Sequence, residues 1–338
     1  MKILVVDYLS YPGHKRFNKI HIDALEGLGH DLFFVGNKYQ FPDYCESRLL
    51  CVPPERFFKT LPFQSVSSRF QNIFCLKWIY SQIHEHDYDL ILFPTYDIVS
   101  LFFSPFKNKC LVINHNNVSQ LNNRIKAWLT RHLPSSVSHI TLDSLSQKRL
   151  QEVIPNAKVY MIPHGFDKPS NNITKPEWLD CDTYFFCPVN RNFNQEDVNK
   201  LFQNSLLQEV LKKAGSCIYI KNFSGIVNSS VLKIIPSNVP QKEYDYMIQK
   251  AKAVILPYNS SFQYRVSGIF FECLASNTPV IVPQIDSFIQ YNDLNVMYYS
   301  DISDFVNKVE ESLNSPSLEY DSTRIMPSQY WNSVIRDL

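Results

Sequence analysis

The sequence predicts an α/β protein built from two doubly wound parallel sheets. Two observations lead to this prediction. Short, continuous apolar runs alternate with helical or polar segments along the chain, and one proline-containing polar stretch divides the runs into two groups. Strands buried on both faces read as such runs, and helices between them fit parallel βαβ crossovers. At 338 residues the chain also suits two domains of about 150 residues each.

The apolar runs give the expected strands in order. The first group is expected at 2–7, 31–35, 89–93, 110–114, 138–142 and 158–162, and the second at 183–187, 216–220, 232–235, 253–256 and 279–282. Between the groups, the segment from Ile162 to Pro169 and the polar stretch 170–176 are punctuated by proline, glycine and asparagine, and hydrophobic periodicity lapses. We therefore place the domain boundary near residue 168.

The composition excludes several classes of function. The 33 basic and 32 acidic residues leave a net charge of +1, so no overall electrostatic attraction to nucleic acid or to a membrane is expected, and only local patches could supply one. The eight cysteines are scattered without the Cys-x-x-Cys pairs that zinc or redox chemistry uses, which indicates a reducing, cytoplasmic setting and no metal site. The apolar run at the N-terminus is a first strand rather than a signal peptide, and no run reaches the ~18 residues of a transmembrane helix.

The most informative segment lies between the strands at 253–256 and 279–282. A polar loop follows the first of these strands and leads into a helix that begins near Gly268 and carries Glu272. This order places a glycine, backbone N–H groups and a carboxylate at the carboxyl end of a parallel strand, where open α/β sheets bind ligands. We therefore expect a nucleotide-sugar site at this edge of the second sheet.

A helix N-terminus at this place is suited to a diphosphate. The negative charge that develops on a diphosphate leaving group is stabilised by basic side chains and by N–H groups at a helix N-terminus. Ser267, Gly268 and Ile269 can supply such N–H groups, and Gly268 permits close backbone approach. Arg265, in the preceding loop, is a candidate phosphate ligand, because guanidinium binds phosphate in a bidentate manner. The alternative for Arg265 is a solvated loop side chain.

The order of these motifs resembles the GT-B-fold glycosyltransferases, specifically the retaining, family-4-like group. The interdomain segment of that group typically reads Pro-x-Gly-x-Asp, matched here by Pro163, Gly165 and Asp167. The resemblance implies two Rossmann-like domains with an interdomain cleft. It assigns acceptor binding to residues 1–168 and nucleotide-sugar binding to 169–322, and it makes 323–338 a closing helix that crosses back to the first domain.

The Glu-x7-Glu motif of that family maps onto the segment that ends at Glu272, with one departure. Glu272 corresponds to the second glutamate, which accepts hydrogen bonds from the ribose hydroxyls; the alternative is a glutamate that only favours the helix dipole. The residue eight positions earlier is Tyr264, where the family has a glutamate that contacts the donor sugar. A phenol can still donate or accept one hydrogen bond. This departure leaves the donor sugar open.

The resemblance assigns further roles across the chain. Arg191 matches a phosphate-binding arginine, and Lys221, at the end of a strand, is the candidate second cation, with a surface strand end as the alternative. The backbone near Val239 corresponds to the part of the family that reads the nucleobase, and His115 to a histidine that contacts the donor sugar. We therefore expect His115, Arg191 and Lys221 to carry catalysis. The resemblance implies no protein base, since the leaving phosphate assists deprotonation of the acceptor.

The turn after the first strand contains two more candidates for donor binding, Gly13 and His14. A glycine there lets the backbone approach a phosphate or a sugar, but the Gly-x-Gly-x-x-Gly fingerprint is absent, which argues against a dehydrogenase. For His14 and His115 the alternative is a structural, hydrogen-bonding histidine. Asp97, which follows the strand at 89–93, is a third polar residue at this rim.

The predicted function is retaining transfer of a sugar from a UDP- or GDP-sugar to a glycan or lipid-linked acceptor, in polysaccharide or glycoconjugate assembly, without a metal or other cofactor. Two alternatives stay open: a catalytically inactive homologue that serves as a binding or partner subunit, and a nucleotide-sugar epimerase of the same fold, whose acid/base carboxylates we cannot place. Basic and aromatic residues at 124–132 and 56–59 make these segments candidates for peripheral contact with the inner face of a membrane. An ordinary amphipathic surface helix is the alternative for the first of them.

Overall fold

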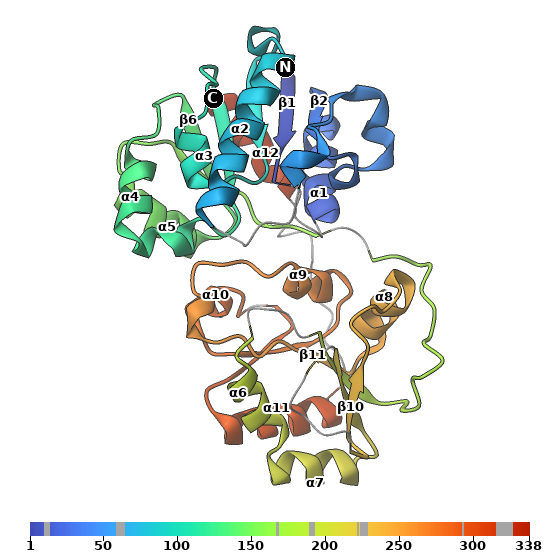
Figure 1. The fold of residues 1–338 in the computed structure, drawn as a ribbon. Helices are drawn as coiled ribbons and strands as arrows, with labels where there is room; N and C mark the ends of the chain where they lie inside the picture. The colour runs from blue at the N-terminus through green and yellow to red at the C-terminus, as the bar shows by residue number, and fades with distance from the viewer. Residues whose placement is uncertain are drawn as a thin grey trace. The chain divides into compact units, whose positions relative to one another are not determined.

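The computed structural model describes residues 1–9, 14–58, 65–166, 169–188, 193–221, 223, 229–292, 294–315 and 327–338, which form two compact units (Figure 1). Unit 1 holds the described residues up to Gly165, the short segment Tyr264–Val266 and the C-terminal helix. Unit 2 holds the described residues from Phe166 to Gln263 and from Ser267 onward, without that helix. The sequence predicts the first boundary near residue 168 and places all of 169–322 in the second domain.

Unit 1 is built on a seven-stranded parallel sheet with the strand order β3-β2-β1-β4-β5-β6-β7. Its strands are β1 (Lys2–Asp7), β2 (Asp31–Gly36), β3 (Leu49–Cys51), β4 (Leu90–Phe93), β5 (Cys110–Asn114), β6 (Val137–Thr141) and β7 (Val159–Met161). Every residue of β4, β5 and β6 is buried, because helices cover both faces of the sheet.

The helices of unit 1 form two layers (Figure 1). They are α1 (His14–Gly27), α2 (Val66–Gln82), α3 (Ile98–Phe102), α4 (Arg124–Arg131), α5 (Ser144–Val153) and α12 (Pro327–Asp337), with short 3-10 turns η1 (Lys38–Gln40), η2 (Asp43–Arg48), η3 (Glu55–Phe58), η4 (Glu85–Asp87) and η5 (Val118–Asn122). Helices α2, α3, α4 and α5 pack side by side in that order, whereas α12 packs on α1. Right-handed crossovers require this split. Strands β2 and β3 are added on one side of β1 and strands β4 to β7 on the other, so the connecting helices of the two groups cover opposite faces of the sheet.

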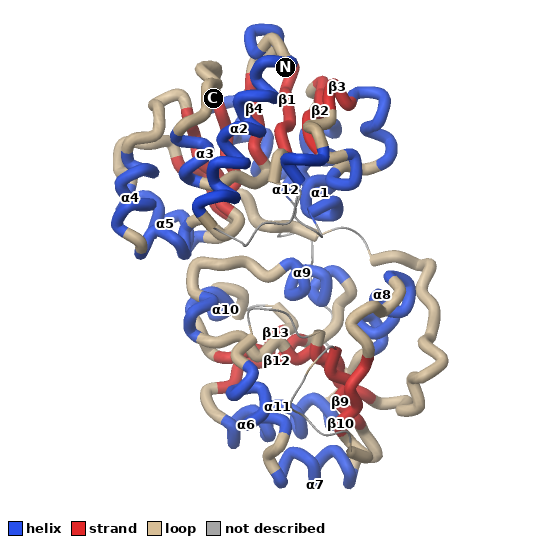
Figure 2. The backbone as a smooth tube through the Cα atoms, viewed as in Figure 1, coloured by secondary structure: helices blue, strands red, loops and turns tan. Residues whose placement is uncertain are grey.

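Unit 2 is a six-stranded parallel sheet with the order β10-β9-β8-β11-β12-β13. Its elements are β8 (Tyr184–Cys187), α6 (Gln195–Phe202), α7 (Ser205–Lys213), β9 (Cys217–Lys221), β10 (Leu232–Ile235), α8 (Gln241–Lys250), β11 (Ala253–Ile255), η6 (Ser260–Phe262), α9 (Gly268–Ala275), β12 (Val280–Pro283), α10 (Asp286–Ile289), β13 (Val296–Tyr299) and α11 (Ile302–Asn314). Figure 2 shows α6, α7 and α11 on one side of this sheet and α8, α9 and α10 on the other.

The two sheets confirm the predicted doubly wound α/β architecture, and the predicted strands agree with the observed ones to within about two residues. Two edge strands, β3 and β13, are not among the expected strands. Strand β3 has only three residues, all of them partly or fully exposed, and β13 buries only Tyr299. An edge strand has one side exposed to solvent. Its sequence therefore lacks the continuous apolar run that marks a central strand.

The C-terminal helix α12 is anchored on α1 by a buried tryptophan. Trp331 is fully buried, and its Nε1–H donates to His21 Nδ1 at 3.2 Å. The helix begins at Pro327, which lies against Gly165, a glycine in the left-handed backbone region with φ of +67°. The helix therefore belongs to unit 1, although α11, the preceding described helix, belongs to unit 2.

All eight cysteines are free thiols. Seven are buried, and Cys51 is partly exposed. Burial raises the pKa of the Cys75 and Cys110 thiols to about 12 and that of Cys51 to about 11. Among the described residues, no helix is both long enough and apolar enough to cross a bilayer.

Candidate functional site

The N-terminus of α9 lies at the point in unit 2 where the strand order reverses, between β8 and β11. Ser267 caps the helix, with its Oγ accepting from the N–H of Phe270 at 3.2 Å. The first intrahelical bond runs from the Phe271 N–H to the Ser267 carbonyl. No helix carbonyl is therefore available to the N–H groups of Gly268 and Ile269, and helix ends of this kind are suited to binding an anion.

Tyr258 holds the capping serine in place, a role that the sequence analysis missed. Its hydroxyl lies 2.8 Å from Ser267 Oγ. The Tyr258 ring stacks on Phe262, with ring centroids 3.8 Å apart, and packs against Phe288 of α10. The only sequence signal was its position directly after a buried strand, where side chains reach the ligand-binding edge of a parallel sheet.

Replacing the cap tests this arrangement. Ser267→Ala removes the acceptor of the Phe270 N–H and the partner of Tyr258, so we expect the free energy of unfolding to fall by about 1 kcal/mol. Ser267→Thr keeps a hydroxyl that can cap the helix and is the matched control. Urea unfolding of the three proteins measures the difference, and equal stabilities of the alanine and threonine variants would contradict the assigned cap.

Three other expected donor-binding positions lie at the same carboxyl edge of unit 2. Lys221 ends β9, and its ammonium lies 5.0 Å from the centre of the Tyr244 ring, a cation–π contact. Val239 is partly exposed between β10 and α8. Glu272 lies one turn into α9 and is partly exposed. The expected arginine, Arg191, lies outside the described residues, as does Asp167 of the interdomain motif.

The carboxyl edge of unit 1 carries a second group of polar residues. Asp7, at the end of β1, is fully buried and accepts from Asn18 Nδ2 at 2.8 Å and Thr95 Oγ1 at 3.1 Å. Asp97, a rim candidate in the sequence analysis, caps α3 by accepting from the N–H of Ser100 at 2.9 Å. Gly13 lies outside the described residues.

Four histidines of unit 1 come together around Phe17. The ring centroids of His115 lie 5.6 Å from those of His14 and 5.7 Å from those of His164, while Phe17 packs against His21 and His115 at 4.6 and 4.9 Å. We call these four histidines the histidine cluster. It brings together α1, the end of β5 and the segment after β7.

The histidine cluster is neutral at pH 7. Burial lowers the pKa of His21 to about 3, with His164 adding to the effect, and lowers that of His164 to about 4. Desolvation, followed by the neighbouring histidines, holds the pKa of His115 well below its usual value of 6.5. The Asn116 amide lies 3.0 Å from His115 Nδ1. With that amide donating, the imidazole proton lies on Nε2, so His115 can offer a substrate one neutral hydrogen-bond donor.

The segment Tyr264–Val266 belongs to unit 1, although its neighbours in the chain belong to unit 2. Tyr264 packs against the hydrophobic cluster of unit 1 and has φ of +61°, a left-handed conformation that is rare outside glycine. Arg265 donates from Nε to Ser119 Oγ at 3.2 Å. Tyr264 and Arg265, the two loop residues that the sequence predicts for donor binding, are therefore held by contacts within unit 1.

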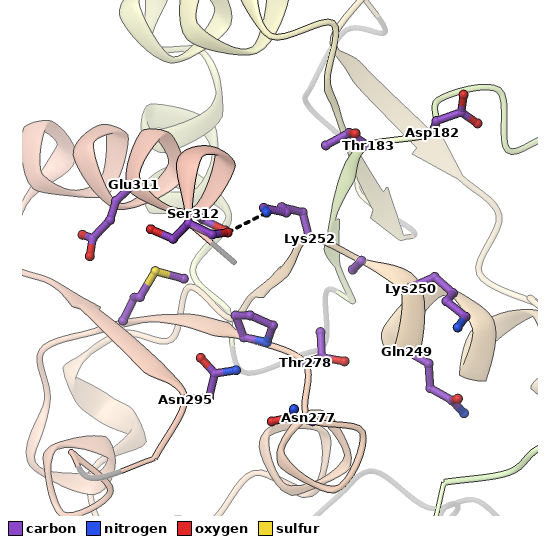
Figure 3. Close-up of a pocket in the computed structure, with 14 residues that line it drawn as sticks. Asp182, Thr183, Gln249, Lys250, Lys252, Asn277, Thr278, Asn295, Glu311 and Ser312 are labelled. Carbon is purple, nitrogen blue, oxygen red and sulfur yellow. Dashed lines mark hydrogen bonds between the residues drawn. The ribbon is translucent and has the colours of Figure 1, made fainter. Parts of the chain in front are cut away.

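A cavity of about 440 Å³ lies at the opposite edge of the unit 2 sheet (Figure 3). Its lining includes residues that precede β8, β11, β12 and β13, namely Thr183, Lys252, Thr278 and Asn295, together with residues of α11. Lys252 donates to the Ser315 carbonyl at 2.8 Å. The cavity is therefore at the amino ends of the strands and contains none of the expected site residues.

No model of a known protein family matches the chain, and no curated protein matches it in sequence. Its structure is nevertheless similar to solved structures along its whole length. A UDP-forming α,α-trehalose-phosphate synthase from Burkholderia xenovorans is 12% identical, with a TM-score of 0.64 over 100% of this chain and 97% of that one. Alr3699/HepE from Anabaena, solved in complex with UDP and glucose, is 12% identical, with a TM-score of 0.63 over 100% and 98%.

A UDP-N-acetylglucosamine 2-epimerase is also similar, at 10% identity and a TM-score of 0.58 over 98% of this chain and 90% of that one. Together these similarities establish the GT-B fold, two Rossmann-like domains with parallel sheets. Because a synthase and an epimerase share it, the fold alone does not select the reaction.

Proposed function

We propose that this protein transfers a sugar from a nucleotide diphosphate sugar to an acceptor. The observation that supports it best is the N-terminus of α9, whose free N–H groups lie at the switch point of unit 2, one turn before Glu272. Among the similar structures, one enzyme is UDP-forming and another protein was solved with UDP and glucose. A nucleotide with a diphosphate suits both the anion-binding helix end and the carboxylate.

In the proposed donor site, three groups of unit 2 bind different parts of the nucleotide sugar. The N–H groups of Gly268 and Ile269 bind the diphosphate together with Lys221 and Arg191. Glu272 accepts the ribose hydroxyls, and the backbone near Val239 reads the base of a UDP- or GDP-sugar. We also propose donor-binding roles for Tyr264, Arg265, His14 and His115.

The proposed transfer proceeds with retention at the anomeric carbon and without a metal. The bond between that carbon and the leaving phosphate oxygen breaks, and the acceptor oxygen forms its bond on the same face. The acceptor proton passes to the leaving phosphate, whose growing charge is stabilised by the helix N-terminus and the cations. This route uses no protein base.

We propose a glycan or lipid-linked acceptor, received by unit 1, in polysaccharide or glycoconjugate assembly. We also propose that the protein is cytoplasmic and contacts the inner face of a membrane peripherally, where it could meet a lipid-linked acceptor. The first expectation to test is binding of the donor nucleotide.

Glu272→Ala is expected to weaken binding of the preferred nucleotide, UDP or GDP, by at least about tenfold, since hydrogen bonds to a charged group contribute about 1.5–3 kcal/mol. Isothermal titration calorimetry measures the affinity. Glu209→Ala, an exposed glutamate on α7 in the opposite helix layer, is the matched control and should bind as the wild type does. Unchanged affinity in Glu272→Ala would remove the ribose assignment, and failure of the wild type to bind either nucleotide would sink the proposal.

Two alternatives rest on specific observations. Tyr264, in place of a glutamate that reads the donor sugar, favours an inactive binding subunit, which would bind nucleotide and release no diphosphate product. The similar 2-epimerase favours an isomerase, which would convert a nucleotide sugar without any acceptor. Acceptor-dependent release of UDP or GDP separates transfer from both.

A further inference from the structure

Three neighbouring helices of unit 1 expose large apolar side chains to solvent. Helix α2 packs beside α3, and α3 beside α4. We call the side chains that these helices and the residue after α3 expose the α2–α4 surface: Val66, Phe70, Phe74, Phe103, Ile125 and Trp128, each with more than half of its area exposed. The Phe102 ring links Phe103 to Trp128, with centroids 5.1 and 5.9 Å away, so the surface is continuous between α3 and α4.

The exposed stripe on α2 is separate from the face that packs on the sheet. The helix buries Cys75, Leu76 and Ile79, whereas Val66, Phe70 and Phe74 recur every four residues and share an exposed face. A surface helix normally turns polar residues outward. An outward row of aromatic residues therefore marks a surface that meets an apolar partner.

The charged side chains of the three helices themselves have one sign. Helix α2 carries Arg69 and Lys77, and α4 carries Arg124 and Arg131, whereas the Lys126 side chain of α4 is buried. The helical residues of α2, α3 and α4 include no aspartate or glutamate, although the whole chain has 33 basic and 32 acidic residues. The nearest acid at the α3 end, Asp97, is engaged as the cap of that helix.

A second copy of this chain is a poor partner for such a surface. A two-fold interface would place the same patch against itself and bring the basic residues of the helices of both copies together. An anionic bilayer offers the opposite charge and an apolar interior, and aromatic rings with lysine and arginine are the side chains that settle at a bilayer interface.

We propose that the α2–α4 surface docks unit 1 onto a bilayer that contains anionic lipids. Phe70, Phe74 and Trp128 enter the boundary between headgroups and acyl chains, while Lys77 and Arg124 lie at the lipid phosphates. Helix α3 begins directly after β4, so this surface adjoins the carboxyl edge of the unit 1 sheet. Docking at this surface implies that the acceptor is lipid-linked. This consequence rests on the proposed function, sugar transfer.

The test is co-sedimentation of the full chain with vesicles of phosphatidylcholine, with and without phosphatidylglycerol. We expect binding only to the vesicles with phosphatidylglycerol and weaker binding as salt is added. Phe70→Ser/Phe74→Ser and Lys77→Glu/Arg124→Glu should each lower the bound fraction at least tenfold. The matched control is Leu206→Ser/Lys213→Glu on α7, which changes an exposed leucine and a lysine elsewhere and should bind as the wild type does.

Nucleotide affinity, measured on the same variants, keeps this inference separate from the proposed function. The surface variants should bind UDP or GDP as the wild type does, which also shows that they fold. Equal vesicle binding by wild type and variants, or none by the wild type, would overturn the inference. A wild-type dimer that the variants dissociate would also overturn it, by assigning the surface to a second copy. Vesicle binding without nucleotide binding would leave the surface standing and remove the proposed transfer.

Discussion

The free energy of unfolding is expected to fall as the pH is lowered from about 6.5 toward about 4, because unit 1 buries the histidine cluster in its neutral form. In the unfolded chain these imidazoles have their ordinary pKa of 6.5, whereas in the folded protein the pKa of His21 is about 3 and that of His164 about 4. As the pH falls, the unfolded state therefore binds protons before the folded state does. The stability is fully present above pH 6.5 and is lost as the pH falls, by up to about 1.4 kcal/mol per pH unit for each histidine.

The surroundings of the cluster set the size of this loss. His14, His115 and His164 repel one another when charged, and Asp7 is the one group that the pKa shifts identify as favouring the charged form of His14. Protonation of His21 also requires a proton on Nδ1, the atom that accepts the Trp331 hydrogen bond. Acid therefore weakens the attachment of α12 as well as the cluster itself.

Urea unfolding between pH 6.5 and about 5 isolates the histidines, since carboxylates stay largely ionised in that range. We expect a steep loss of stability for the wild type and a shallower one for His21→Gln, which has one titrating group fewer. His86→Gln removes an exposed histidine and should keep the wild-type slope. A stability that does not change across this range would show that the cluster is not buried and neutral.

Gly165→Ala is expected to lower the free energy of unfolding by about 3 kcal/mol, through left-handed strain and a steric clash. An added Cβ would lie 2.6 Å from Cδ of Pro327 and 3.1 Å from Cγ2 of Ile20. Because Pro327 begins α12, the helix must shift to make room. Unfolding in urea gives the size of the loss.

Gly215→Ala is the matched control for this variant. Gly215 has φ of +61°, close to the +67° of Gly165, but an added Cβ there meets nothing within 4 Å. It should therefore show the cost of the backbone alone, about 1 kcal/mol. Adding Pro327→Ala to Gly165→Ala should recover part of the stability. If the two single glycine variants lose the same amount, the contact with Pro327 carries no weight.

The central strands and the capped helix α9 could be predicted because their signals are local. A strand such as β5, buried on both faces, must be apolar throughout, and a serine before a glycine-led apolar helix is a common cap. The edge strand β13 escaped prediction because its exposed positions interrupt the apolar run. Its pairing with β12 is a tertiary contact that the local composition does not predict.

The candidate site could be predicted only in part, for the same reason. The positions of Ser267, Gly268 and Glu272 follow from one strand, one loop and one helix. The bond between Tyr258 and Ser267 and the contact of Arg265 with Ser119 depend on tertiary packing. The sequence offers the histidines only as separate candidates, whereas their shared burial arises from several elements distant in the chain. The roles of Gly13 and Arg191 stay predictions.

The burial of the native thiols makes this protein well suited to site-specific labelling. Maleimides and related reagents react with the thiolate, and the raised pKa of Cys51, Cys75 and Cys110 leaves very little thiolate at neutral pH. A single cysteine introduced on an exposed face, for instance at Glu209, would therefore react ahead of the native ones. Fluorophores or spin labels can be attached in this way with all eight natural cysteines left in place.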